Sequence, residues 1–481
     1  MSLKSQTISG VKWTTISTVN NSVVQMVKLL ILARLLEKQD FGLIAIALMI
    51  IGLTDIFANL GLAVGLIHKQ NITQKQYSSV FWLNLLISTV LFLGLWAVSP
   101  LFSNFYHEPM LNTIIPLLGL QLVISSFGKM FLTFKTKELE FKFISIVNII
   151  GIEIAAIFTV ILALNGFGVF SLVYGMLLQT TIIQAIYAIS GIKKYRILFH
   201  FNLKEITDLL KIGGFQVGTQ IVDYIASKLD IFLIGRFFGI ELLGIYNLAK
   251  ELILKVIQVI NPIITNVATP AFAKIQQNVE LMRTHYLQIL KTLSSINFPI
   301  FITLFIFANS VTLVIYGEKM MEAAQFVRIL SLWGLLLSVG NPAGILMVSL
   351  GRTDLGFYWT LVRASITLLA IFAASFFGLN AVAYAQVVIG FIFFFLYWKM
   401  MIYKMVQIPL KIYCKTNLKP LGFALLAAIP ALPFLLFNQL SIQLLGVVLY
   451  FISYLVCNFL LNRKFITEML HLVLNRNLSK N

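Results

Sequence analysis

Charged residues are scarce in this sequence of 481 residues. Asp, Glu, Lys and Arg make up 11% of it, whereas hydrophobic residues make up 59%. A soluble domain carries roughly 25% charged residues, so this chain cannot cover its surface with polar side chains. Two cysteines, Cys414 and Cys457, are too few for a secreted disulfide scaffold, and we expect free thiols. The 40 phenylalanines exclude disorder. The sequence therefore predicts an all-α, polytopic integral membrane protein.

Several functional motifs are absent as well. No G-x-x-x-x-G-K-[ST] phosphate loop occurs, which excludes ATP as the direct energy source. No extramembrane segment carries paired carboxylates or a Ser/His arrangement, so we expect no catalytic residue and no enzyme activity. The histidines all fall in expected connections or tails, so we expect no metal site. They are His68, His107, His200, His285 and His471.

Long apolar runs recur along the whole chain. A helix needs about 20 apolar residues to cross a bilayer, which predicts about fourteen spans. The expected spans are 13–36, 41–66, 79–99, 111–133, 143–164, 168–190, 212–236, 242–266, 292–315, 324–349, 358–377, 380–401, 420–437 and 442–461. The first span contains Asn20, Asn21, Gln25 and Lys28, unlike a cleavable signal peptide, so we expect it to be retained.

The net charge of +18 would suggest nucleic-acid binding in a soluble protein. Here most of the 36 Lys and Arg residues fall in alternate connections, counted from the N-terminus, so the positive-inside rule accounts for the charge without nucleic acid. This alternation predicts that both termini are cytoplasmic. The two longest connections, 191–211 and 267–291, mix apolar and basic residues. We expect interfacial amphipathic helices there, with plain linkers as the alternative.

The sequence contains an internal repeat with an offset of 202 residues. ARLLEKQDFGLIAIA (33–47) aligns with GRFFGIELLGIYNLA (235–249), so that Arg34 matches Arg236 and Gly42 matches Gly244. The first and seventh spans also share a polar stripe with the spacing i, i+4, i+7, i+11, i+14, which lies on one helix face.

An offset of six helices predicts a parallel repeat, as in some secondary transporters. We expect an N-terminal lobe at 1–200, a second six-helix lobe at 201–405, and two C-terminal helices with a cytoplasmic tail at 406–481. The two lobes would enclose a cleft lined by helices 1, 2, 7 and 8. A duplicated bundle without a cavity is the alternative.

Charged residues inside the expected spans concentrate on those four helices. Each is costly in a bilayer, at roughly 2.5–3.5 kcal/mol, so it must pair or line water. Cations outnumber anions there, which predicts an electropositive cleft suited to a phosphate or diphosphate. The substrate-binding candidates are Lys28, Lys228, Lys250, Arg34, Arg236, Asn21 and Gln25. Snorkelling toward the interface is the alternative for the basic residues at helix ends.

Five carboxylates in expected spans could take up and release a coupling ion. They are Asp55, Asp223, Asp230, Glu153 and Glu251. A structural ion pair is the alternative for each of them. We expect no bound cofactor, with either H⁺ or Na⁺ as the coupling ion.

The segment ILARLLEKQDFGLIAIALMIIGLTDIFANLGLAVGLIHK (31–69) resembles the opening of bacterial polysaccharide transporters of the multidrug/oligosaccharidyl-lipid/polysaccharide flippase superfamily. IGRFFGIELLGIYNLAKELI (234–253), NPIITNVATPAFAKIQQN (261–278) and GILMVSLGRTDLG (344–356) are similar to later parts of the same family. The likeness covers most of the chain up to about residue 400 and is nearest to the Wzx-type exporters of lipopolysaccharide, colanic acid and teichuronic acid.

This resemblance implies a two-lobed helical flippase that moves a polyprenyl-diphosphate-linked oligosaccharide across the inner membrane by alternating access. It implies that Lys28, Lys228 and Lys250, with Arg34 and Arg236, hold the diphosphate. A glycan polymerase or other export machinery is an expected partner. A cation-coupled multidrug antiporter, a lipid II flippase and an inert assembly scaffold remain as alternatives.

Overall fold

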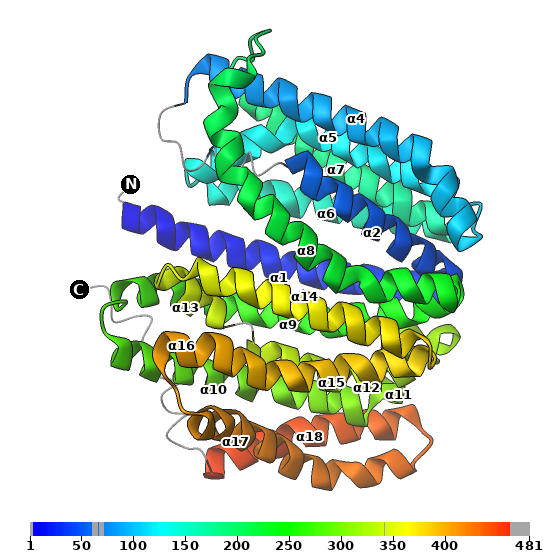
Figure 1. The fold of residues 1–481 in the computed structure, drawn as a ribbon. Coiled ribbons are helices and arrows are strands. Elements are labelled where there is room, and N and C mark those ends of the chain that lie inside the picture. The colour runs from blue at the N-terminus through cyan, green and yellow to red at the C-terminus, as the bar shows by residue number, and fades with distance from the viewer. Residues whose placement is uncertain (1–2, 60–65, 67–71, 341, 462–481) are drawn as a thin grey trace. The chain divides into compact units, whose positions relative to one another are not determined.

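The computed structural model describes residues 3–59, 66, 72–340 and 342–461 (Figure 1). Within these residues the secondary structure is helical, without a strand, and twelve helices are long and apolar enough to cross a membrane. The predicted all-α, multi-pass architecture is therefore confirmed. The count of about fourteen spans stays a prediction. The expected seventh and eighth spans are α8 (Thr207–Phe237) and α9 (Ile240–Lys274), which lie outside that set of twelve and carry many of the charged residues.

The helices form two compact units. The first comprises Met1–Leu248, Ile315–Met320 and Phe357–Ala385, and the second comprises Ala249–Val314, Met321–Gly356 and Gln386–Asn481. This grouping follows the packing of helices and does not test the lobes expected at 1–200 and 201–405 or the C-terminal part at 406–481, which stay a prediction.

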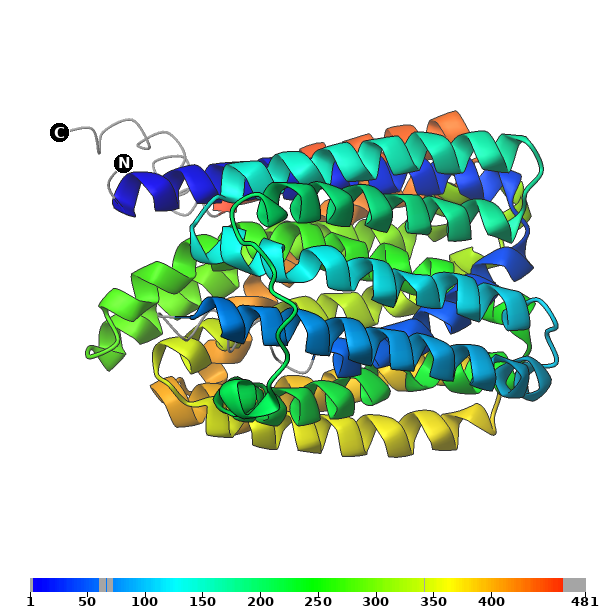
Figure 2. The same cartoon turned by 90° about the horizontal axis from the view of Figure 1, so that it is seen from above.

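Aligned pairs of long helices build the first unit. The pairs α4/α5 and α6/α7 are antiparallel and the pairs α5/α7 and α1/α6 are parallel, and Figures 1 and 2 show their axes roughly aligned. Phe131 and Tyr187 are fully buried between them. The helices are α1 (Leu3–Leu35), α2 (Lys38–Asn59), α4 (Gln74–Tyr106), α5 (Leu111–Lys137), α6 (Phe141–Leu164), α7 (Val169–Ile192), α8, the start of α9, most of α14 (Thr353–Ser375) and the start of α15 (Leu379–Tyr397).

Helix α10 (Val279–Ile306) is central to the second unit, where it packs against α12 (Ala323–Gly340) and α17 (Leu410–Ala428). Buried polar groups join α10 to its neighbours: Asn297 donates to Asn261 Oδ1 of α9 at 3.0 Å, and Ser294 donates to Asn417 Oδ1 of α17 at 2.8 Å. The unit also contains the rest of α9, most of α11 (Ala308–Tyr316), α13 (Ala343–Ser349), the rest of α15, α16 (Tyr403–Val406) and α18 (Leu440–Leu461).

Several helix boundaries coincide with capping residues or prolines in the sequence. Thr73 and Gln76 form a reciprocal capping box at the start of α4, and Asn278 accepts from Leu281 N at the start of α10. Pro342 comes directly before α13, so the expected span 324–349 is divided between α12 and α13. Prolines at 430 and 433 convert the end of the expected span 420–437 into a 3₁₀ segment, Ile429–Leu436.

The interfacial helices expected at 191–211 and 267–291 are present only in part, because residues 193–202 are not helical and most of 267–291 belongs to the long helices α9 and α10; their interfacial location stays a prediction. Residues 193–206, here called the strap, run from α7 to α8 mainly as an extended segment, which ends in one 3₁₀ turn at Leu203–Ile206. The strap stays extended because hydroxyl groups of α4 capture its backbone N–H groups, as described below. In 267–291, α9 continues to Lys274 and α10 already begins at Val279, so only a short turn separates them.

Candidate functional site

The first turns of α2 and α9 cross in direct backbone contact. A Cβ atom added at Gly42 would fall on the carbonyl oxygen of Ile240, and one added at Gly244 would fall on the carbonyl oxygen of Lys38. Both glycines lie in helical segments and are buried. The approach is therefore closer than any side chain at either position would permit.

This crossing is reciprocal. Gly42 corresponds to Gly244 at the repeat offset of 202 residues, and Lys38 corresponds to Ile240 at the same offset. Each glycine meets the backbone of the residue that lies four positions before the other glycine. Such an exchange is what a local two-fold relation between equivalent helices produces. The repeat found in the sequence is thus visible in this contact.

Ion pairs surround the crossing. Lys38 lies 3.6 Å from Glu241, and Lys319 lies 2.7 Å from Glu37. The side chains of Glu37 and Glu241 are largely exposed, so each pair adds little stability on its own. The predicted substrate-binding residue Arg34, at the end of α1, is exposed and lies beside Gly317.

Arg236, the repeat counterpart of Arg34, is also exposed at the end of α8. Its guanidinium lies 5.1 Å from the ring centre of Phe105, a cation–π geometry. Both predicted arginines therefore lie at helix ends near the crossing, which agrees with the snorkelling alternative for their positions.

The predicted polar stripe is present on α1. Asn21, Gln25 and Lys28 are all partly buried, and Gln25 and Lys28 each have interaction partners. The Oδ1 atom of Asn21 is buried without a hydrogen-bond partner. Asn20 donates to Glu153 Oε1 of α6 at 3.3 Å, which places the predicted ion-coupling residue Glu153 against α1.

On α8, Asp223 forms an ion pair with Arg363 of α14. The neighbouring Tyr224 donates to the carbonyl oxygen of Met49 on α2 at 3.0 Å, and its hydroxyl fills the space beside Gly52. Helix α8 is thereby joined to α14 on one side and to α2 on the other. The predicted binding residue Lys228 lies one turn beyond, partly buried and with partners of its own.

Asp230 is the most buried of the predicted carboxylates, with 2% of the residue exposed. Its Oδ2 atom accepts from the hydroxyl of Tyr246 on α9 at 2.8 Å, and its Oδ1 atom accepts from Ile231 N at 2.9 Å. Tyr246 is fully buried. Both carboxylate oxygens are satisfied within the α8–α9 packing, which is the pattern of a structural hydrogen bond.

Asp55 on α2 is half-buried and pairs with Lys129 of α5 at 3.2 Å. Asn59, one turn further along α2, donates to its other oxygen at 2.9 Å. Lys250 and Glu251 belong to the second unit, where Lys250 is 4% exposed and has partners, and Glu251 is partly buried. That Lys28, Lys228 and Lys250 line one cleft therefore stays a prediction.

Three charged or hydroxyl-bearing partners of the predicted carboxylates were not found from the sequence: Lys129, Arg363 and Tyr246. Nothing local connects Arg363 with Asp223, which is 140 residues away. Lys129, the partner of Asp55, lies near the end of its expected span and 74 residues from that carboxylate. The signal that could have found both is charge balance, because an isolated carboxylate in a span requires a cation nearby.

A helical membrane protein with a tandem repeat and charged residues on its repeated helices has the features of a secondary transporter. The protein-family comparison identifies the group more closely. The model of the family described as "Polysaccharide biosynthesis protein" matches residues 31–325, and the chain belongs to this family. The family resemblance seen in the sequence is thus confirmed.

Two curated relatives agree with this assignment. The chain is 30% identical over 371 residues to the lipopolysaccharide biosynthesis protein WzxC of Escherichia coli (strain K12), covering 77% of this chain and 75% of that protein. It is 29% identical over 434 residues to the teichuronic acid biosynthesis protein TuaB of Bacillus subtilis (strain 168), covering 90% and 89%.

Solved structures share the fold at lower sequence identity. The lipid II flippase MurJ in an inward closed conformation matches with a TM-score of 0.79 at 14% identity, covering 94% of this chain and 99% of that one. An inward-facing multidrug resistance transporter of the MATE family and MOP superfamily matches with a TM-score of 0.62 at 14% identity, covering 80% and 97%. These likenesses establish the fold and not the substrate.

Proposed function

We propose that the protein is a flippase that moves a polyprenyl-diphosphate-linked oligosaccharide across the bacterial inner membrane by alternating access. The family and its relatives in lipopolysaccharide and teichuronic acid biosynthesis support this class of substrate. A curated relative of Rhizobium meliloti is named as a succinoglycan biosynthesis transport protein, which supports transport rather than catalysis.

One observation carries the choice of an anionic substrate. Asp55 and Asp223, two of the carboxylates on the repeated helices, pair with cations that come from other helices, Lys129 of α5 and Arg363 of α14. The repeated helices carry more basic than acidic residues, and two of the acidic ones are thus matched by cations from other helices. This composition suits a diphosphate, because lysine ammonium groups bind phosphate oxygens through charge-assisted hydrogen bonds.

The proposal assigns the diphosphate to Lys28, Lys228 and Lys250, with Arg34, Arg236, Asn21 and Gln25 as further contacts. It assigns coupling to H⁺ or Na⁺ among Asp55, Asp223, Glu153 and Glu251, with Asp230 as the weakest candidate because its oxygens are already satisfied. Both termini would be cytoplasmic, following the alternation of basic residues. A glycan polymerase would receive the product on the far side.

The test is transport by the purified chain in proteoliposomes that contain a labelled polyprenyl-diphosphate glycan. Lys28→Ala combined with Lys228→Ala should lower the flipping rate at least about tenfold, because a hydrogen bond to a charged group contributes about 1.5–3 kcal/mol. Lys12→Ala combined with Lys75→Ala removes two exposed cations and should leave the rate unchanged. Full flipping by the first variant would remove the proposed phosphate site.

The same vesicles distinguish the alternative functions. Lipid II and a cationic dye are offered in separate experiments with the same protein. A lipid II flippase would move lipid II faster than the glycan carrier, and a multidrug antiporter would move the dye against an ion gradient. Preference for either over the glycan carrier would contradict the proposal.

A further inference from the structure

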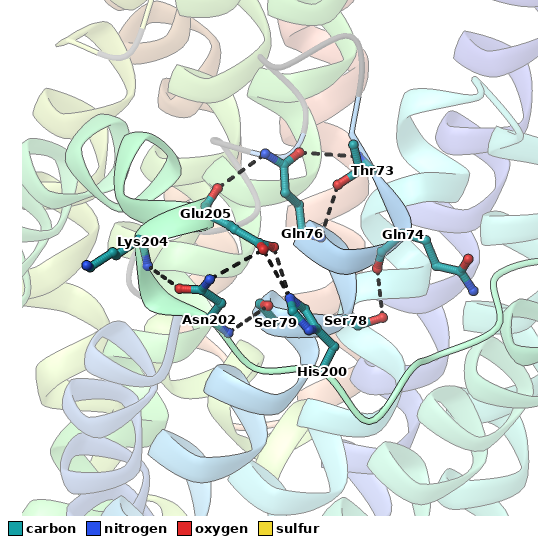
Figure 3. A network of polar contacts seen from close by, with 9 residues as sticks. All are labelled: Thr73, Gln74, Gln76, Ser78, Ser79, His200, Asn202, Lys204 and Glu205. Atoms are coloured by element: carbon teal, nitrogen blue, oxygen red, sulfur yellow. Dashed lines mark hydrogen bonds and ion pairs between the residues drawn. The ribbon is translucent and has the colours of Figure 1, made fainter.

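The strap is fastened to the first turns of α4 along most of its length (Figure 3). The amide of Gln74 donates to Arg196 O at 2.9 Å, and Leu198 N donates to Ser78 Oγ at 3.0 Å. Further along the strap, Asn202 N donates to Ser79 Oγ at 3.1 Å. Side chains of one helix thus hold the backbone of an irregular segment at several successive points.

A second set of contacts stiffens the strap itself. Figure 3 shows the carboxylate of Glu205 facing His200 and Asn202, at 3.1 Å and 3.4 Å from their side-chain nitrogens. Gln76 bridges the two segments, because its amide nitrogen donates to Glu205 O at 3.2 Å and its amide oxygen accepts from Thr73 N at 3.2 Å. The outward side chains of the strap are therefore presented in a fixed arrangement.

Those outward side chains are apolar. Phe199 is 97% exposed, and its ring lies 4.8 Å from that of Trp82, whose indole nitrogen donates to Leu198 O at 2.9 Å. Phe201 is 48% exposed. Together with Leu86 and His200, these aromatic residues line an open pocket of about 310 Å³. A rigid, exposed aromatic pocket marks a surface that binds something apolar.

The pocket continues into the lipid-facing surface of α4. Leu86, Val90, Leu93 and Trp96 are each more than half exposed and lie on one face of this membrane-spanning helix. Lipid chains must cover that face in a bilayer. An acyl chain lying along α4 would meet the pocket at Leu86, which belongs both to the face and to the pocket.

Cations flank the same pocket along the strap. Lys193, Arg196 and Lys204 are exposed, and the side chain of Lys204 points away from the polar network in Figure 3. Lys194 differs from them, because it is held by Glu138 at 2.5 Å. Three exposed cations beside an apolar pocket that borders the bilayer complement a lipid with a negatively charged headgroup.

We propose that the strap and α4 form a binding site for an anionic phospholipid of the surrounding membrane. Its acyl chain would lie against Trp82, Leu86, Phe199 and Phe201, and its phosphate against the cations at 193, 196 and 204. None of these residues is among the lysines assigned to the glycan carrier, so the inference does not depend on the proposed function.

The experiment measures quenching of Trp82 fluorescence by lipids with brominated acyl chains. The full chain is placed in phosphatidylcholine vesicles that contain increasing fractions of brominated phosphatidylglycerol or brominated phosphatidylcholine. The sequence holds six tryptophans, so the Trp82 signal is the difference between the wild type and Trp82→Phe. The site predicts that phosphatidylglycerol quenches this signal at a lower fraction than phosphatidylcholine does.

Two variants and two matched controls complete the test. The triple variant Lys193→Gln, Arg196→Gln, Lys204→Gln should lose the preference for phosphatidylglycerol, by about fivefold in relative affinity per cation. Phe199→Ser with Phe201→Ser should reduce quenching by both lipids. The controls are Lys404→Gln, Lys411→Gln, Lys415→Gln and, separately, Phe377→Ser, which remove the same charge and an exposed phenylalanine elsewhere and should change nothing.

Three results would overturn the inference. Equal quenching by both lipids in the wild type would show ordinary annular lipid, and this comparison needs no variant to fold. An unchanged preference in the strap triple variant would remove the cations from the site. Displacement of brominated phosphatidylglycerol by polyprenyl phosphate at a much lower fraction would assign the pocket to the carrier lipid instead.

Discussion

The carbonyl oxygen of Ile240 occupies the space that a side chain at Gly42 would require. The equivalent relation holds between Lys38 and Gly244, so two helices from different halves of the repeat approach through their backbones. In a transporter that alternates its access, such a crossing must either persist or separate completely, because the backbone carbonyl groups that meet the two glycines cannot rotate away as side chains do.

Replacement of either crossing glycine by valine should therefore separate α2 from α9. We expect Gly42→Val and Gly244→Val each to lower the free energy of unfolding by about 1–3 kcal/mol, the usual cost of overpacking, and to reduce transport strongly. Thermal unfolding in detergent and flipping in proteoliposomes measure the two effects. Gly94→Val is the control, because a Cβ atom there would meet nothing within 4 Å. Wild-type stability in both crossing variants would show that the helices can separate without loss.

The pair between Asp223 and Arg363 should behave as one unit in transport. We expect Asp223→Asn and Arg363→Gln each to weaken the dependence of flipping on an ion gradient, and the double variant to resemble the worse single variant. The cost in unfolding free energy should be about 1 kcal/mol or less, since half of the Asp223 side chain is exposed. Arg352→Gln with Asp354→Asn removes a comparable exposed pair as a control. If the losses of gradient dependence in the two single variants add up in the double variant, Asp223 and Arg363 act independently.

Asp230 should affect folding more than coupling. Its hydrogen bond from Tyr246 is buried, so Asp230→Asn and Tyr246→Phe should each cost about 1 kcal/mol or more of stability. The ratio of transport with a gradient to transport without one should stay unchanged per folded molecule. Calorimetry and gradient-dependent flipping provide the two readings. If the Asp230→Asn protein is as stable as the wild type but its flipping no longer depends on the ion gradient, Asp230 is a coupling residue.

The strap should loosen in acid at its first residues. Burial tends to raise the pKa of Glu138, but hydrogen bonds from Lys194 and Tyr195 outweigh it and lower that pKa below its ordinary value of 4.5. A carboxylate with a lowered pKa stabilises the folded state above its unfolded pKa and loses this contribution as the pH falls through the folded pKa. The amide protection factors at residues 194–196, obtained from hydrogen exchange relative to the slower intrinsic exchange in acid, should therefore fall as the pH drops below about 4.5.

Glu138→Gln should produce the same loss of protection already at neutral pH. Glu280→Gln is its control, because Glu280 pairs with Arg283 of α10 rather than with the strap. Exchange that is equally slow in wild type and Glu138→Gln at all pH values would show that the hydrogen bonds to α4 hold this part of the strap without the carboxylate.

The long helices and the repeat could be predicted from the sequence, because each rests on a periodicity that neighbouring residues carry. The match between Gly42 and Gly244 even anticipated a structural contact. The partners of Asp55 and Asp223 could not be predicted. They lie 74 and 140 residues away in sequence, and their pairing depends on how the helices pack, which no local pattern encodes.

The strap shows why the helix expected there is missing at residues 193–202. Its mixture of apolar and basic residues is the composition of an amphipathic helix, but Ser78 and Ser79 of α4 take the backbone donors that such a helix would use internally. Composition indicated an interfacial location, whereas the conformation was decided by hydroxyl groups more than 100 residues earlier in the chain.

The α2–α9 crossing has an evolutionary consequence. Both glycines meet the carbonyl group of the opposing residue, Lys38 or Ile240, whereas only Ile240 also brings a side-chain atom, Cγ2, to the contact, so the side chain of Lys38 is not constrained by it. After gene duplication, one half can therefore carry a lysine and the other an isoleucine at equivalent positions. The symmetry of the ancestral repeat is then retained in the main chain, although the side chains have diverged.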